Sequence, residues 1–227
     1  MSRFAAGLLV LALSAAAAVS INELANARDH QDLNALDQII KQEQKNATTA
    51  EAQYRLALAY SYAAEVAMEL HDKRKSEELA EAGLDFARKA SAANLTNAEY
   101  HRLIGQLCGQ VIPANPVMGA LRYGQCARDE IEKAIQLNPK LALAYVSRGV
   151  GNYYLPVQMG GGPELAIKDF DKAIALNPKL SDAYLWKGVA LRKMNKDAQA
   201  REALQRALEL DPNRAWARQQ LEKTPAP

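Results

Sequence analysis

Two cysteines and three histidines are the residues of this chain whose side chains are best suited to chemistry. His30, His71 and His101 lie in separate stretches and lack the spacing of metal-ligating histidines. The sequence also lacks a nucleophile elbow, a phosphate-binding lysine loop and a catalytic pair of carboxylates. These observations predict a protein that is not an enzyme and that holds neither a metal nor a cofactor.

Cys108 and Cys126 enclose 17 residues and allow two interpretations. In an oxidising compartment they could form a disulfide bond. Otherwise they would be two small buried apolar side chains, which is what free cysteines usually are. The choice depends on where the chain resides and on whether the fold brings the two thiols together.

The composition is that of a folded helical protein with little affinity for nucleic acid. Apolar residues make up 49% of the chain and charged residues 24%, as is usual for globular proteins. Alanine, leucine, lysine, glutamate and glutamine are abundant, which favours helix. The formal net charge is only +2 and no long basic run occurs, so we expect no nucleic-acid partner.

The N-terminus has the pattern of a secretory signal peptide. Arg3 precedes an uncharged, mostly apolar stretch from Phe4 to Val19, and Ala18 and Ser20 are small residues at the two positions that a signal peptidase reads. The alternative is a retained membrane anchor, but the stretch is shorter than the roughly 20 residues that a membrane span needs. We therefore expect residues 1–20 to be cleaved and the protein to be periplasmic or secreted. Membrane contact would require an uncleaved signal.

A nine-residue sequence occurs twice in the second half of the chain. Residues 133–141 and 172–180 are nearly identical, and residues 206–212 are a looser copy. The proline of the first copy precedes that of the second by 39 residues, and the second precedes the third by 34. This period is typical of stacked helical hairpins. Because a stacked array presents an extended surface rather than an enclosed pocket, it favours binding over catalysis.

Residues 181–214 resemble the tetratricopeptide repeat, a 34-residue helical hairpin. The matching positions are Tyr184, Gly188, Ala200, Leu204, Ala207 and Pro212. Gly188 and Ala200 lack bulk, which lets two antiparallel helices approach closely, and Pro212 ends the second helix. The one departure is Lys187, where the family usually has leucine. The resemblance implies an all-α fold, a right-handed α-solenoid of such hairpins with N- and C-terminal capping helices.

The repeat register predicts how the chain after the signal is divided. Residues 21–48 should form an N-terminal capping helix, at Leu33–Gln44, and a linker, followed by the array at 49–227. We expect a degenerate repeat at about 50–93, repeats with insertions at 98–141 and 142–180, a regular repeat at 181–214 and a capping helix at 213–223. Caps are needed because the outer faces of terminal repeats would otherwise expose the core.

Two repeats carry insertions between their helices. Gly109–Gly124 contains ten residues more than the standard spacing, and Leu155–Pro163 accounts for five more. We expect both to be widened loops on one edge of the array, where insertions often form the binding face. The register also places Cys108 and Cys126 opposite each other at the base of the longer insertion.

The concave face of the array is the candidate binding site. Its predicted residues in the last two repeats are apolar or aromatic with a basic rim, namely Val146, Val150, Tyr153, Tyr154, Leu185, Val189 and Arg192. The family's lysine and asparagine clamp for peptide carboxylates is absent from these positions. An open groove of this kind would take an apolar segment of a protein partner or an apolar small solute. Alternatively, a capping helix or an insertion fills it.

These patterns predict a non-catalytic scaffold for a protein partner in a bacterial cell envelope, and a homo-oligomer is compatible with them. A second interpretation comes from the segment Tyr153–Gly162, which is similar to the periplasmic tetratricopeptide component associated with TRAP-type transporters. That resemblance implies a bound solute or lipid, often in an oligomer. A third interpretation is a subunit of an envelope enzyme with a site built from the insertions.

Overall fold

The computed structural model describes residues 18–226, and this part of the chain folds into helices joined by short turns, without a β-strand. The helices are α1 (Ile21–Asp29), α2 (Leu33–Gln44), α3 (Ala50–Glu69), α4 (Lys73–Ala93), α5 (Ala98–Val111), α6 (Pro116–Leu137), α7 (Ala142–Tyr154), α8 (Pro163–Leu176), α9 (Ser181–Lys193), α10 (Asp197–Leu210) and α11 (Ala215–Glu222), with two 3-10 turns, η1 (Ile112–Ala114) and η2 (Val157–Met159). The all-α fold expected from the sequence is confirmed.

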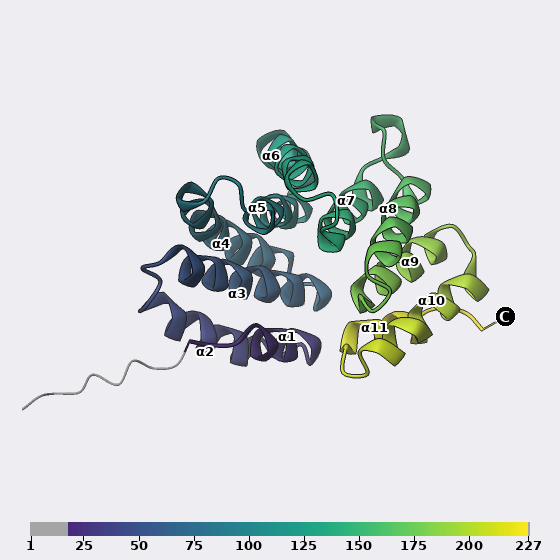
Figure 1. Cartoon of the computed structure of the whole chain (residues 1–227). Helices are drawn as coiled ribbons and strands as arrows, with labels where there is room; N and C mark the ends of the chain where they lie inside the picture. The colour runs from purple at the N-terminus through teal and green to yellow at the C-terminus, as the bar shows by residue number, and fades with distance from the viewer. Residues whose placement is uncertain (1–17, 227) are drawn as a thin grey trace, which may run out of the picture.

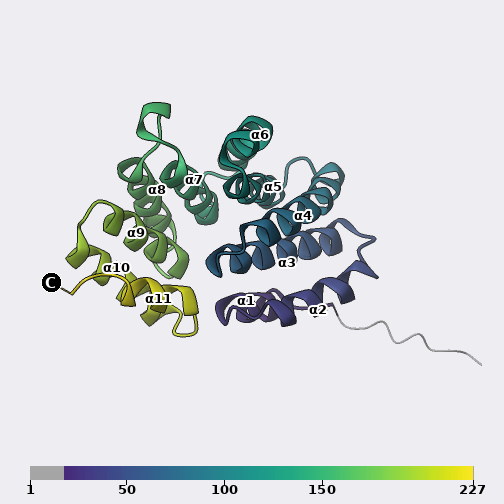
Figure 2. The ribbon, with the colours of Figure 1, turned by 180° about the vertical axis from the view of Figure 1, so that it is seen from behind.

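Consecutive helices pair as antiparallel hairpins that stack along the chain (Figure 1). The hairpins are α3 with α4, α5 with α6, α7 with α8, and α9 with α10, and each contacts the next. Figures 1 and 2 show the array curling so far that α11, near its end, comes back beside α1, near its start. The predicted solenoid is therefore strongly curved, and its two ends meet.

The repeated sequence forms the joint between one hairpin and the next. Asn138 ends α6 in an extended conformation, and its side chain accepts a hydrogen bond from the backbone N–H of Lys140 at 3.0 Å. The hydroxyl of Tyr145, in the following helix, donates to the carbonyl of Pro139 at 3.1 Å. The second copy repeats both contacts, with Asn177 bound to Lys179 and Tyr184 bound to Pro178. The sequence recurs because each joint requires the same local hydrogen bonds.

Glycines allow the two helices of a hairpin to touch. A Cβ atom added to Gly149 in α7 would lie 2.4 Å from the ring of Phe170 in α8, which is fully buried. The last hairpin repeats this arrangement, since a Cβ on Gly188 would lie 2.6 Å from the side chain of Leu204. The close approach predicted for Gly188 is confirmed.

The N-terminal part contains one helix more than the sequence patterns indicated. The capping helix expected at Leu33–Gln44 is α2, and α1 precedes it. Ser20 and Glu23 form a capping box at the start of α1, each side chain bonding the other residue's backbone N–H. Most of the predicted signal, residues 1–17, lies outside the described residues. Within the described part, none of the helices combines the length and the apolar character that crossing a membrane requires.

The longer insertion, Gly109–Gly124, is mostly helical, so the prediction of a widened loop was wrong there. α5 runs on to Val111, and after the short turn η1 the helix α6 begins at Pro116. Asn115 caps α6 by accepting from the N–H of Met118 at 3.3 Å, and proline suits the first position of a helix. The extra residues therefore lengthen both helices of this hairpin.

Candidate protein-interaction surface

The structure buries part of the concave face that the sequence predicted as a binding site. Val146, Leu185 and Val189 are buried, Val150, Tyr153 and Arg192 are half-buried, and Tyr154 is 55% exposed. Of these seven residues, only Tyr154 presents a large apolar surface to solvent.

α11 occupies the groove of the last repeat. Its Trp216 and Ala217 pack in one apolar cluster with Leu185 and Val189 of α9. Arg192, which was expected on a basic rim, donates to the side-chain oxygen of Gln220 at 2.6 Å. Leu185 and Val189 are therefore not available to a partner, and the alternative of a capping helix in the groove holds for this repeat.

Four aromatic side chains form a continuous row from α7 across α9 to α11. The ring centroids lie 5.0 Å apart for Tyr153 and Tyr154, 5.9 Å for Tyr153 and Trp186, and 5.0 Å for Trp186 and Trp216. The ammonium of Lys193 lies 4.2 Å from the ring centroid of Tyr153, within reach of a cation–π contact. We call these four residues the aromatic row, and Tyr154 is its exposed end.

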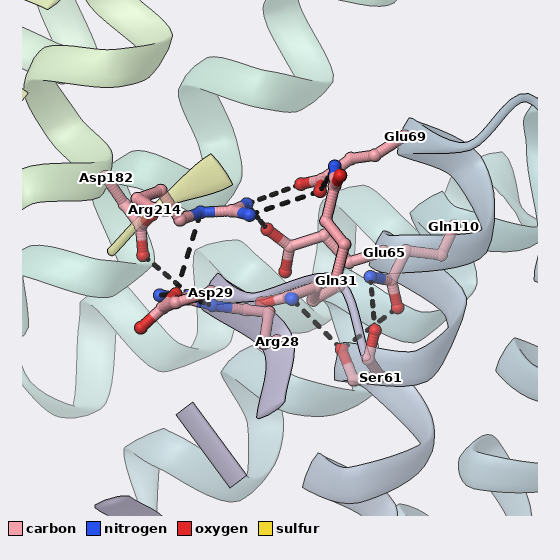
Figure 3. Close-up of polar contacts among 10 residues, drawn as sticks. Arg28, Asp29, Gln31, Ser61, Glu65, Glu69, Gln110, Asp182 and Arg214 are labelled. Atoms are coloured by element: carbon pink, nitrogen blue, oxygen red, sulfur yellow. Dashed lines mark hydrogen bonds and ion pairs between the residues drawn. The ribbon is translucent and has the colours of Figure 1, made fainter. Parts of the chain in front are cut away.

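A cluster of charged side chains joins the two ends of the array (Figure 3). Its members, here called the charged seam, are Arg28 and Asp29 of α1, Glu65 and Glu69 of α3, Asp182 of α9, and Arg214 just before α11. The side chain of Arg214 is 1% exposed, and its Nη2 atom lies 2.6 Å from Glu65 and 2.5 Å from Glu69. Arg28 Nη1 lies 2.9 Å from Asp182 Oδ2.

The seam contains four carboxylates and two guanidinium groups, so its negative charge is not fully compensated. Burial raises the pKa of Glu65 to about 7, although Arg214 and Arg28 act in the opposite direction. Burial alone would raise the pKa of Asp182 as well. The charges of Arg28 and Arg214 outweigh burial there and bring the pKa of that carboxyl below its usual value. The protonation of Glu65 therefore changes near neutral pH, inside the contact that closes the array.

Two buried polar atoms of the charged seam lack hydrogen bonds. Arg214 Nε and Asp182 Oδ1 are buried without a hydrogen-bond partner, and the two atoms lie 3.8 Å apart. Beside them, Gln31 donates to Glu69 at 2.8 Å and accepts from Gln219 at 2.9 Å, which adds a neutral bridge between α3 and α11. The ends of the array are thus held by polar contacts rather than by an apolar core.

The insertions carry the two most exposed large apolar side chains of the described chain, Leu121 and Val117, and several others. Val117, Met118 and Leu121 are 77%, 57% and 79% exposed in the first turns of α6, and their spacing puts them on one side of the helix. We call them the α6 apolar face. Val157 and Met159 of η2 are 65% and 67% exposed. The loop around η2 projects beyond the ends of α7 and α8 (Figure 1).

A disulfide bond holds the base of the longer insertion. Cys108 of α5 and Cys126 of α6 are joined, with their Cα atoms 6.0 Å apart. The bond ties α5 to α6 five residues after Leu121, the last residue of the α6 apolar face, and so fixes the helix that presents this face. The repeat register had placed the two cysteines opposite each other.

The histidines have structural roles where their contacts are defined. His101 Nδ1 lies 2.6 Å from Glu130 Oε2, and its Nε2 lies 3.0 Å from the carbonyl of Leu95, which ties α5 to α6 and to the preceding turn. Among the residues that the structure describes, there is no group of His, Cys, Asp and Glu that could hold a metal ion.

The fold and this surface define a tetratricopeptide-type helical scaffold, a class of protein that is typically non-catalytic and suited to protein interaction. The model of the tetratricopeptide repeat matches residues 181–214. A second family model, described as Regulator of microtubule dynamics protein 1-3, matches residues 19–155. The chain belongs to this second family. The sequence patterns did not indicate it, because the repeat motif is clearest at residues 181–214, outside the matched residues.

Sequence similarity to a known protein covers less than half of this chain, whereas similarity in fold covers most of it. Regulator of microtubule dynamics protein 3 of Bos taurus is 31% identical over 96 residues, which are 42% of this chain and 20% of that protein. The chain thus spans about a fifth of the length of this curated relative. The structure of TTC0263, a tetratricopeptide protein of Thermus thermophilus, aligns with 89% of this chain over 97% of its own length. The sequence identity is 16% and the TM-score is 0.62. The haemophore HusA of Porphyromonas gingivalis covers 86% and 94% at 16% identity and a TM-score of 0.55. Both structures are similar in fold alone.

Proposed function

We propose that this protein is a non-catalytic scaffold of a bacterial cell envelope that binds a protein partner through the α6 apolar face. The observation that carries the proposal is the exposure of Val117, Met118 and Leu121 on one side of α6. Three large apolar side chains in adjacent turns are the kind of patch that marks an interaction site on a soluble surface.

The shape of the surface favours a protein over a small molecule. The α6 apolar face is convex, as one side of a helix must be, and it is held in place by the Cys108–Cys126 bond. A convex, rigid apolar helix suits a groove or a flat patch on another protein. A small solute would instead need a concavity that surrounds it.

The proposed location rests on the N-terminal pattern and on the disulfide. The apolar leader is typical of export, and a bonded pair of cysteines is stable in an oxidising compartment. The related bovine protein is named for microtubule dynamics, but this chain corresponds to a fifth of it. We therefore carry over no activity from that protein, and the proposed protein partner rests on the tetratricopeptide repeats of this chain.

A pair of variants tests the surface. Val117→Asp with Leu121→Asp should abolish retention of the partner that copurifies with the tagged protein, while the thermal midpoint stays unchanged because both side chains are exposed. Leu95→Asp is the matched control, since Leu95 is 66% exposed but lies at the far end of α4, in the turn to α5. Equal retention by both variants would exclude the α6 apolar face.

The aromatic row supports a second candidate, an apolar solute or lipid bound beside Tyr154, as in a component of a TRAP-type transporter. Trp186 and Tyr153 are half-buried next to the exposed ring of Tyr154, and Lys193 lies at the edge of the row. Mass spectrometry of an extract of the denatured protein should then detect a small apolar compound. Tyr154→Asp should remove that compound while leaving partner retention by the α6 apolar face intact.

A further inference from the structure

The backbone of Val19 is held by a buried carboxylate at the point where the fold begins. The N–H of Val19 donates to Glu43 Oε1 at 3.1 Å, and Glu43 is 3% exposed. The other carboxylate oxygen of Glu43 accepts from Arg55 Nε at 3.3 Å. A buried glutamate that faces the start of the folded chain is positioned to bind a positively charged N-terminus as well as an amide.

The side chains on either side of this contact show which residues belong to the fold. Val19 is 9% exposed and packs in the same apolar cluster as Leu24, Leu36 and Ile40. Ser20 caps α1 through its capping box with Glu23. Ala18, one residue earlier, is exposed. The chain therefore leaves the folded body between Ala18 and Val19.

Cleavage after Ser20, as the sequence pattern first indicated, would damage this arrangement. It would remove the N-cap of α1 and the buried side chain of Val19, and it would leave Glu43 buried without its backbone donor. Loss of the cap alone destabilises the first turn of a helix. The sequence offers a second site two residues earlier, because Ala16 and Ala18 also form the small-x-small pattern that signal peptidases read.

We propose that the leader is cleaved between Ala18 and Val19, so that the mature chain starts at Val19 and its α-ammonium pairs with the buried carboxylate of Glu43. The inference rests on the proposed export of the protein. The apolar run Phe4–Leu13 contains no charged residue and ends before the small residues of this site, as in a signal peptide. Hydrolysis of the Ala18–Val19 peptide bond consumes one water and releases the leader as a carboxylate and Val19 as an amine.

The new N-terminus would strengthen the contact that the amide already makes. A hydrogen bond between two ionised groups is roughly twice as strong as one between neutral groups. Cleavage would thus add a charge partner to Glu43 on the side opposite to Arg55. Only a chain that begins at Val19 gains this pair, because any residue placed before it converts the ammonium back to an amide.

The intact mass and N-terminal sequence of the protein exported by its native host test the cleavage site. We expect Val19 as the first residue. A first residue of Ile21 or Ala18 would overturn this inference but leave the proposed export standing. A chain that keeps its leader at the final location would overturn both the proposed cleaved export and this inference.

A second experiment tests the ion pair with purified chains that begin at Val19, Ala18 or Ile21. The Val19 form should unfold about 2–4 °C above the Ala18 form, which differs from it by one exposed alanine. In the Glu43→Gln background this difference should disappear. The Ile21 form should be the least stable of the three, by at least about 4 °C relative to the Val19 form. Equal midpoints for the Val19 and Ala18 forms would overturn the proposed pair.

Discussion

The Nη2 atom of Arg214 lies 2.6 Å from Oε1 of Glu65, although the two residues are 149 positions apart in the sequence. Glu65 lies on α3 near the start of the array, and Arg214 directly precedes α11 at its end. The contact therefore closes the curved array on itself. In an open solenoid each repeat contacts only its neighbours, whereas here the first and last elements also support each other.

Loss of the Arg214 side-chain charge should destabilise the whole array. Arg214→Met leaves Glu65 and Glu69 buried without their main partner, and breaking a buried ion pair in this way typically costs about 3–5 kcal/mol. Urea denaturation followed by circular dichroism would measure the loss in the free energy of unfolding. Arg218→Met, on the exposed side of α11, is the control and should change it by less than about 0.5 kcal/mol. Equal effects of the two variants would show that the seam contributes little.

The protonation of Glu65 should make the free energy of unfolding depend on pH. Its pKa rises from 4.5 to about 7 on folding, so the folded chain holds a proton that the unfolded chain releases between these values. Glu65 therefore stabilises the folded state at low pH. This contribution to the free energy of unfolding is lost as the pH rises through about 7, by at most about 1.4 kcal/mol per pH unit. Glu65→Gln removes this loss while keeping an acceptor for Arg214.

The measurement is the free energy of unfolding of both proteins across this pH range. We expect the variant to gain stability relative to the wild type as the pH increases from about 4.5 to 7. A difference that does not change with pH would contradict the raised pKa of Glu65.

Two glycines of α7 should respond to alanine with opposite signs. Gly149→Ala places a Cβ atom 2.4 Å from the ring of Phe170, and overpacking of this kind costs about 1–3 kcal/mol. Gly151→Ala meets no atom within 4 Å, so the better helix propensity of alanine should stabilise the protein by up to about 1 kcal/mol. Thermal unfolding of both variants under one condition provides the comparison. Similar midpoints would contradict the tight α7–α8 contact.

Reduction of the disulfide should lower the free energy of unfolding by about 3 kcal/mol, if loop-closure entropy accounts for its effect. The reason is that Cys108 and Cys126, with a sequence separation of 18, close a loop in the unfolded chain. Thermal unfolding with and without a reductant would measure the effect. The Cys108→Ser, Cys126→Ser variant is the control and should not respond to the reductant. Two reactive thiols in the denatured protein, purified without a reductant, would contradict the bond.

The repeat architecture could be predicted because its determinants are local. The Asn138–Pro139 joint and the Gly149 contact recur at a fixed spacing, so the sequence shows them as a period. The start of α6 inside the longer insertion is also encoded locally, by Asn115 and Pro116, although the glycines and prolines of the insertion favour a loop. The extra helix α1 had a comparable signal in Ser20 and Glu23.

The sequence by itself determined the hairpins, their order, the small residues between their helices and the facing positions of Cys108 and Cys126. Each of these depends on hydrogen bonds and packing between residues that are close along the chain or one repeat apart. Only the tertiary structure decided that α11 fills the last groove and that Arg28 and Arg214 are buried in the seam. In the sequence these arginines look like ordinary surface charges, because the curvature that brings them to Asp182 and Glu65 accumulates over every hairpin of the array.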